Sequence, residues 1–141
     1  MSCTVRTAVA ADIPAMHRIR CAVAENPLPP HIVITEASYR PFVRAGSAWV
    51  VEEHGRLRGF AAVDGPASNV WALFLEPEAE GQGIGRALLD GALQWARGAG
   101  LERLWLTTAK GTRAERFYAR AGWERRGLTA GGEVRFERNI V

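Results

Sequence analysis

The segment EGQGIGRALL, residues 80–89, places glycine at positions 81, 83 and 85, just before a run that is typical of a helix. The apolar stretch VWALFL at 70–75 precedes it, so the glycines lie where a strand passes into a helix. Glycine lets a backbone approach a ligand closely, and the unpaired amides and dipole of a helix N-terminus attract anions. The segment therefore predicts a pyrophosphate-binding loop, and a turn that only needs positive φ is the alternative.

Two common nucleotide-binding motifs do not fit this loop. The pattern G-x-G-x-x-G would need its third glycine at Arg86, and G-x-x-x-x-G-K-[ST] would need a lysine there. Lys110 is the only lysine of the chain and lies elsewhere. A generic nucleotide-binding domain remains an alternative, which would bind adenine nucleotides as well as larger cofactors.

The segment GTRAERFYARAGW, residues 111–123, predicts a second helix that carries candidate functional side chains. Thr112 and Glu115 form a capping-box pattern, and Gly122 stands where a helix commonly ends. One stripe of this helix is apolar and contains Phe117 and Tyr118, while the opposite stripe carries Arg113, Arg116 and Arg120. The arginines are either a solvated face or phosphate contacts, and Tyr118 is either a core residue or a functional phenol.

The rest of the chain supplies alternating strands and helices that would position both segments. Strands are predicted at 4–9, within 47–64 as a pair joined near His54 and Gly55, at 69–77 and at 101–108. One helix is predicted to run to about Asn26, capped by Asp12 and with Pro14 as its second or third residue, and a second is predicted over 35–45. The strand, glycine loop, helix and strand of 70–108 form a β-α-β unit, whose two strands should be parallel.

Composition indicates one globular domain, 1–141, with 48% apolar and 23% charged residues. No apolar run is long enough for a bilayer and no signal peptide is evident, so we expect a cytoplasmic protein without membrane contact. Cys3 and Cys21 show neither a disulfide framework nor a zinc pattern, and no metal is expected. Arginine makes up 17 of 18 basic residues, which suits an anionic small molecule, whereas no dense basic run favours nucleic acid. A homodimer is left open.

Together the two segments resemble the GCN5-related N-acetyltransferase (GNAT) family. EGQGIG is similar to its Q/R-x-x-G-x-G/A signature, and FYARAGW is similar to its second motif, F-Y-x-x-x-G-F. VAEN (23–26), WALFL (71–75) and TRAERFYARAGW also resemble small bacterial members. The resemblance implies an α/β fold with a mixed, mostly antiparallel sheet, flanked by about four helices. Its fourth and fifth strands would be parallel and splayed apart.

The same resemblance implies an acetyl-CoA-dependent enzyme that moves an acetyl group directly to an amine. Backbone groups of Leu73, Phe74 and Leu75 would bind the pantetheine arm and polarise the thioester, and Tyr118 would protonate the departing thiolate. The remaining cofactor contacts would be Phe117 and the amides that hold the pyrophosphate, namely Gly81, Gln82, Gly83, Ile84, Gly85 and Arg86. Glu80 and Gly111 depart from the family pattern, in which glutamine or arginine and asparagine are usual.

The acceptor and the general base are less well marked. Asn69 is the polar residue nearest the glycine loop on the preceding strand and cannot act as a base, which leaves Glu25, His31, Glu36 and His54 as candidates. Relatives use the region of VAEN to wall the acceptor site, which favours Glu25 as catalytic and substrate-binding residue.

Three prolines limit the flexibility of the segment ENPLPPHIVITEASY, and relatives use the equivalent region to roof the acceptor pocket. With Trp49 and Trp71, the resemblance therefore implies a preformed, partly aromatic cavity for a small primary amine or an amino-acid-like acceptor. In this interpretation Glu25 and Glu36 attract the ammonium group of the acceptor. A protein or peptide N-acetyltransferase and a non-catalytic acyl-CoA-binding module are the alternatives.

Overall fold

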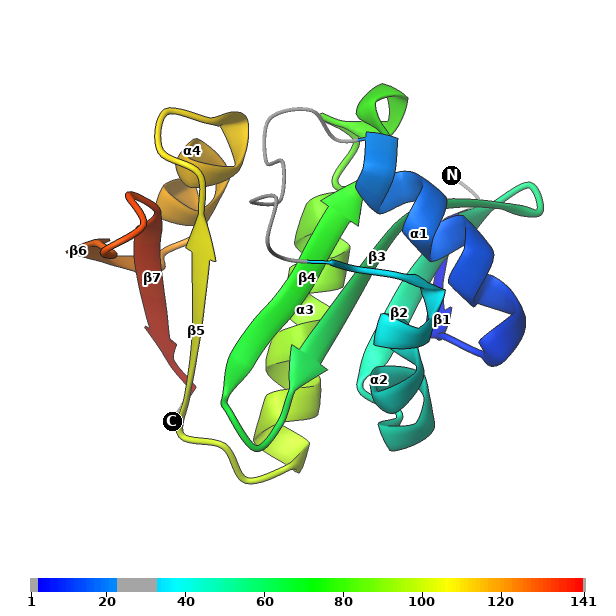
Figure 1. The fold of residues 1–141 in the computed structure, drawn as a ribbon, viewed down its shortest axis with the longest axis horizontal. Helices are drawn as coiled ribbons and strands as arrows, with labels where there is room; N and C mark the ends of the chain where they lie inside the picture. The colour runs from blue at the N-terminus through cyan, green and yellow to red at the C-terminus, as the bar shows by residue number, and fades with distance from the viewer. Residues whose placement is uncertain (1–2, 23–32, 141) are drawn as a thin grey trace.

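The computed structural model describes residues 3–22 and 33–140, which form a seven-stranded sheet with helices on both faces (Figure 1). The strand order is β1-β2-β3-β4-β5-β7-β6, and every neighbouring pair is antiparallel except β4 and β5. The predicted α/β fold with a mixed, mostly antiparallel sheet is therefore confirmed. The strands are β1 Cys3–Thr7, β2 Ala48–Glu53, β3 Arg56–Asp64, β4 Asn69–Leu75, β5 Arg103–Thr108, β6 Glu124–Leu128 and β7 Val134–Asn139.

Four α-helices occur in the described residues: α1 Ile13–Ala22, α2 Arg40–Ala45, α3 Ile84–Gly98 and α4 Arg113–Arg120. Short 3-10 turns precede α1, α2 and the glycine loop, at Ala10–Asp12, Glu36–Tyr39 and Pro77–Ala79. The helix α1 begins directly after Asp12 with Pro14 as its second residue, as predicted, but the Asp12 side chain does not cap it: the carboxylate accepts the Val9 amide and binds Arg6, both at 2.8 Å. Gly46 ends α2 with a φ of 69°, as the pattern predicts.

Apolar side chains on the two sheet faces form two cores. Figure 1 shows α1 and α2 in front of the sheet and α3 behind it. Phe60 and Ala62 of β3 pack in the core on the α1 side, whereas Ala61 and Val63 pack in the core on the α3 side. This alternation follows from the two-residue period of a strand that is buried on both faces.

The parallel strands β4 and β5 touch at only one end. Their one register pair is Asn69 with Trp105, where the Trp105 amide donates to the Ser68 carbonyl at 2.9 Å. The Asn69 side chain donates to the Trp105 carbonyl at 3.1 Å, so Asn69 is held in this junction. Beyond it the two strands diverge towards their carboxyl ends (Figure 1), which confirms the predicted splay between them.

Candidate active site

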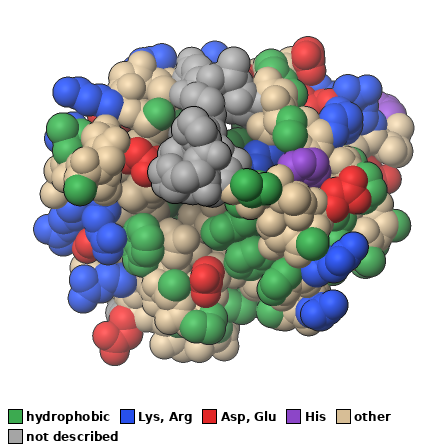
Figure 2. Space-filling view, in the orientation of Figure 1, with side chains coloured by type: hydrophobic (Ala, Val, Ile, Leu, Met, Phe, Trp, Pro, Cys, Tyr) green, Lys and Arg blue, Asp and Glu red, His purple; other side chains and the backbone are tan. Residues whose placement is uncertain are grey.

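A cavity of about 820 Å³ occupies the space between the diverging strands β4 and β5. One end lies on the α1 side of the sheet, lined by Arg20, Ile34, Trp71 and Phe74. The other end is lined by Leu75, Gly85, Phe117 and Tyr118, which belong to the α3 side or pack against it. Figure 2 shows hydrophobic side chains gathered near the middle of this face of the molecule. The cavity thus passes from one face of the sheet to the other along the free edge of β4.

The free edge of β4 presents backbone groups to the cavity. The Glu76 amide donates to the backbone carbonyl of Arg58 in β3 at 2.9 Å, and Phe74 is the register partner of Phe60. Because successive residues of a strand point their amides and carbonyls to opposite sides, those of Leu73 and Leu75 face the cavity. Phe74 instead directs its backbone to β3 and contributes its side chain to the cavity wall.

The glycine loop opens α3 with its amides exposed to the other end of the cavity. Gly81 and Gly83 both have a φ of +80°, a conformation that other residues rarely adopt. Gly83 is the N-cap of α3, so the amides of Ile84, Gly85 and Arg86 belong to the first turn and lack intrahelical acceptors. Six consecutive residues therefore form a positively polarised surface at the helix N-terminus.

Side chains of the loop contribute unequally to this surface. Gly81, Gly83, Gly85 and Arg86 line the cavity, whereas Gln82 and Ile84 do not. The exposed Gln82 side chain donates to the Glu78 carbonyl at 3.2 Å, and Ile84 is buried in the core below the helix. Gln82 and Ile84 can therefore offer only their backbone amides to an anion.

Glu80, the acidic departure from the family pattern, is paired with a base. Its carboxylate lies 3.0 Å from the Arg113 guanidinium at the start of α4, and both residues line the cavity. The pair offsets the negative charge that Glu80 would otherwise direct at a pyrophosphate. Arg120 also lines the cavity but Arg116 does not, so only part of this stripe of α4 lies where it could meet a ligand.

Tyr118 reaches the cavity from inside the core. Its ring contacts Phe117, Trp123 and Phe136, with centroids 5.2 to 5.9 Å apart, and only 6% of the residue is exposed. Burial raises the pKa of Tyr118 above the ordinary value of 10, which keeps the phenol protonated at neutral pH. Tyr118 is therefore a core residue, as one expectation had it, and it also lines the cavity where a functional phenol would have to lie.

Two contacts fix the start of α4 beside the cavity. The Thr112 hydroxyl accepts the Glu115 amide at 3.3 Å, as a capping box requires. The Glu115 carboxylate, however, accepts the Gly111 amide at 2.8 Å in place of the N-cap amide. Gly111 has a φ of +77°, so glycine at this departure from the family pattern fits a left-handed turn.

The predicted acceptor residues are only partly brought together. Trp71 lines the α1 end of the cavity, where it stacks on Phe42 with ring centroids 4.4 Å apart. Trp49 does not line it, because its ring points to the other face of the sheet and packs 6.2 Å from Trp95. Trp49 is therefore left out of the proposed site.

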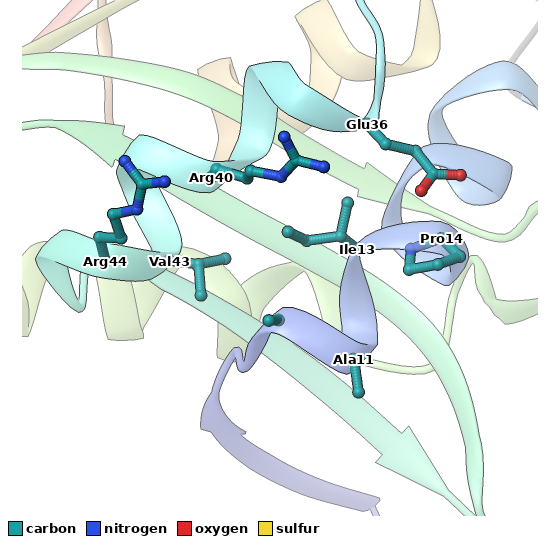
Figure 3. Close-up of a pocket in the computed structure, with 8 residues that line it drawn as sticks. Ala11, Ile13, Pro14, Glu36, Arg40, Val43 and Arg44 are labelled. Atoms are coloured by element: carbon teal, nitrogen blue, oxygen red, sulfur yellow. The ribbon is translucent and has the colours of Figure 1, made fainter.

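None of the candidate bases within the described residues lines the cavity. Glu36 borders a separate pocket of about 360 Å³ between α1 and α2, together with Pro14 and Arg40 (Figure 3). His54 sits in the β2–β3 turn with a φ of 52°. Glu25 and His31 lie outside the described residues. The expectation that Glu36 attracts the acceptor is wrong for this geometry.

Sequence reasoning missed Arg20, which lines the α1 end of the cavity. Its guanidinium lies over the Phe74 ring at 4.5 Å and the Trp71 ring at 5.4 Å. A signal was present in the sequence: Arg20 follows Ile13 by seven residues and Met16 by four, so it continues the buried stripe of α1. A charged residue on such a stripe marks a site that needs an explanation.

Neither metal binding nor a membrane span finds support in the part of the chain that the structure describes. Over residues 3–22 and 33–140, no group of three or more histidine, cysteine, aspartate or glutamate residues could hold a metal ion. Over the same ranges, every helix is too short or too polar to cross a bilayer.

Comparisons with known proteins agree with this geometry. Ard1 from Thermoplasma volcanium has 18% identity and a TM-score of 0.84, covering 100% of this chain and 99% of its own. An N-acetyltransferase from Staphylococcus aureus Mu50 has 18% identity and a TM-score of 0.82, covering 100% of both chains. The protein yncA from Salmonella typhimurium, solved with acetyl-CoA, has 19% identity and a TM-score of 0.81, covering 100% of this chain and 95% of its own. No curated protein sequence matches significantly.

These similarities establish the shared fold, and a sequence-family model gives the family itself. The model described as the acetyltransferase (GNAT) family matches residues 13–123, most of the chain and all of both motif segments. The chain belongs to the GNAT acetyltransferase family.

Proposed function

We propose that this protein is an acetyl-CoA-dependent N-acetyltransferase that moves the acetyl group directly to a small-molecule amine. One observation carries the proposal: the free edge of β4, the glycine loop and Tyr118 all border the same cavity. Each of the three parts answers one need of the reaction, namely thioester binding, pyrophosphate binding and protonation of the leaving group. The acetyl-CoA in the structure of yncA supports the same choice of cosubstrate.

The lining of the cavity offers partners for the parts of acetyl-CoA. The amides of residues 81–86 at the start of α3 suit the pyrophosphate. The free amides and carbonyls of Leu73 and Leu75 suit the pantetheine amides, which would extend the sheet as an added strand does. A β4 amide beside the thioester would donate to its carbonyl oxygen and stabilise negative charge there.

Tyr118 then acts on the departing thiolate. A thiol has a pKa of about 8.5, below that of this phenol, so complete transfer of the phenolic proton to a thiolate is unfavourable by itself. Tyr118 therefore donates a hydrogen bond to the sulfur as the carbon–sulfur bond breaks, and it passes its proton to the thiolate only as the proton that the amine loses returns to the phenol. Overall the amine gives up one proton and coenzyme A leaves as the thiol.

The concave and partly aromatic α1 end of the cavity favours a small acceptor. Trp71 and Phe74 wall this end, and Ile34 adds apolar surface. A concave, partly apolar site can surround most of a small amine while its nitrogen approaches the thioester. An amine with a pKa near 10 attacks only as the neutral form, so its reaction should accelerate as pH rises.

A thiol-release screen tests this proposal. Acetyl-CoA is incubated with the protein and with amines, amino acids, polyamines, aminoglycosides or peptides, and free thiol is measured. We expect release with one small-molecule class and little with peptides. Acetyl-CoA that raises the melting temperature without any thiol release would identify a non-catalytic binding module. Peptides that react faster than every small amine would reassign the acceptor to proteins.

A further inference from the structure

Arg20 holds a partly buried positive charge at the α1 end of the cavity. One of its terminal nitrogens, Nη1, is buried and has no hydrogen-bond partner. Arg20 forms no ion pair or hydrogen bond with any residue in the described ranges, 3–22 and 33–140. A buried donor without an acceptor costs free energy, so Arg20 needs an explanation, and an acceptor atom on a bound ligand would provide one.

The aromatic side chains around Arg20 stabilise its positive charge without neutralising it. The faces of Phe74 and Trp71 support the guanidinium plane, at 4.5 and 5.4 Å from the ring centroids. Burial lowers the pKa of Arg20, but a guanidinium remains protonated at neutral pH. The nearby Tyr39 is a neutral phenol, because burial raises its pKa to about 12. The Tyr39 hydroxyl is engaged with His17 Nδ1 at 2.9 Å.

Acidic side chains of the cavity wall lie away from Arg20. Among the described lining residues only Glu80 and Glu133 are acidic. Glu80 precedes the glycine loop and pairs with Arg113, and Glu133 lies in the turn between β6 and β7. The glycine loop, which suits the pyrophosphate, belongs to the α3 side of the sheet. Over residues 3–22 and 33–140, no acidic side chain pairs with Arg20, which leaves its charge for an anion of the second substrate.

We propose that Arg20 binds a carboxylate of the acceptor, so that the acetylated amine is an amino acid or a similar small amine bearing a carboxylate. This inference rests on the proposed N-acetyltransferase function. The planar fork of a guanidinium matches the two oxygens of a carboxylate, and two parallel hydrogen bonds would fix the orientation of the acceptor. With its carboxylate held on the α1 side, the acceptor directs its amine towards the free edge of β4. The nitrogen bonds to the acetyl carbon, the carbon–sulfur bond breaks, and the amine proton ends on the thiol.

Paired acceptors test the proposal on the unmodified protein. The twenty amino acids are compared with their α-carboxamides in the thiol-release assay, since each amide keeps the amine and side chain but lacks the negative charge. We expect the best acid to exceed its amide about 10- to 100-fold in kcat/KM, the size of a lost charge-assisted hydrogen bond. Equal use of acids and amides would overturn the carboxylate site.

Arg20→Met then assigns the preference to this residue, with Arg44→Met on α2 as the matched control outside the cavity. Arg20→Met should abolish the preference for acids, leave acetyl-CoA affinity unchanged and retain or raise the melting temperature. Arg44→Met should keep the preference. A preference that survives Arg20→Met contradicts the proposal.

Binding gives a readout apart from turnover. By calorimetry, the N-acetyl derivative of the best acid should bind the wild-type protein and lose at least tenfold in affinity with Arg20→Met. Equal affinity for both proteins contradicts the carboxylate site. Thiol release with amines but without acid preference overturns this inference alone, whereas acetyl-CoA binding without any thiol release overturns the proposed function.

Discussion

Replacing Glu76 with glutamine should destabilise the fold at neutral pH and weaken the support of the glycine loop. Glu76 follows β4, and its carboxylate is almost fully buried among three arginines. It accepts from Arg18 of α1 at 2.7 Å, from Arg58 of β3 at 2.9 Å and from Arg56 Nε at 3.1 Å. One side chain thereby joins α1 and β3 to the segment that leads into the loop.

The magnitude follows from the pKa of Glu76. The arginines, Arg56 foremost, lower it from the ordinary value of 4.5 to about 2. At about 1.36 kcal/mol for each pKa unit, the ionised form contributes about 3 kcal/mol of stability. Because the folded-state pKa is depressed, this stability is present above pH 4.5 and disappears as pH falls towards 2. Arg18 and Arg56 are 46% and 61% exposed and return to water when unpaired, so we expect a loss of about 2 to 3 kcal/mol.

Urea unfolding at pH 7, 4 and 3 measures the effect. The difference in unfolding free energy between wild type and Glu76→Gln should be largest at pH 7 and shrink as pH falls. Glu102→Gln, at an exposed residue, is the matched control and should change stability by less than about 0.5 kcal/mol at every pH. A Glu76→Gln loss that is absent, or equal at pH 7 and pH 3, would refute the reasoning.

Three further predictions concern the cavity. Tyr118→Phe keeps the ring packing, so the melting temperature should change little, but it removes the proton donor, so turnover should fall about 10²- to 10⁴-fold. Turnover that stays within about twofold, with chemistry rate-limiting, would remove the phenol from the mechanism. As pH rises, kcat/KM should rise because more of the amine is neutral. Burial raises the pKa of Tyr118, so the profile should show no descending limb below about pH 10. A descending limb near pH 8.5 would argue against a buried phenol at this position. A methyl at Gly85 would lie 3.5 Å from both Leu75 and Phe117, so Gly85→Ala should fold. Because Gly85 lines the cavity, the added methyl should weaken acetyl-CoA binding about 10- to 100-fold by calorimetry. Gly91→Ala adds the same methyl to α3 outside the cavity and should leave that affinity unchanged while raising stability by up to about 1 kcal/mol.

Local signals predicted the elements that hold the site. The glycines before α3, the N-cap Thr112 and the left-handed Gly122 each depend on residues close in sequence, and each occurs in the structure. The parallel pair β4 and β5 also followed, because a strand, helix and strand in succession allow few arrangements. The start of α1 directly after Asp12 followed too, whereas the capping role of the Asp12 carboxylate did not, since it binds Arg6 of β1 and the Val9 amide.

Contacts between distant segments could not be predicted in the same way. Residues 48–51 of β2 are all buried, so no alternation of polar and apolar residues shows which sheet face Trp49 occupies. Glu76 gathers Arg18, Arg56 and Arg58 across 58, 20 and 18 residues of sequence. The helical spacing places Arg20 on the buried stripe of α1, but the sequence does not show that its guanidinium lies over Phe74 and Trp71. Such clusters depend on register and packing, which a single sequence does not specify.

Product stoichiometry tests the central claim most directly. Acetyl-CoA labelled with ¹³C in its acetyl group is incubated with the best acceptor of the screen, and coenzyme A thiol, acetylated amine and free acetate are measured in one reaction. Direct transfer predicts one acetylated amine for each thiol, with acetate no higher than in a reaction without protein. Bound acetyl-CoA that yields only acetate, or neither product, would contradict the account.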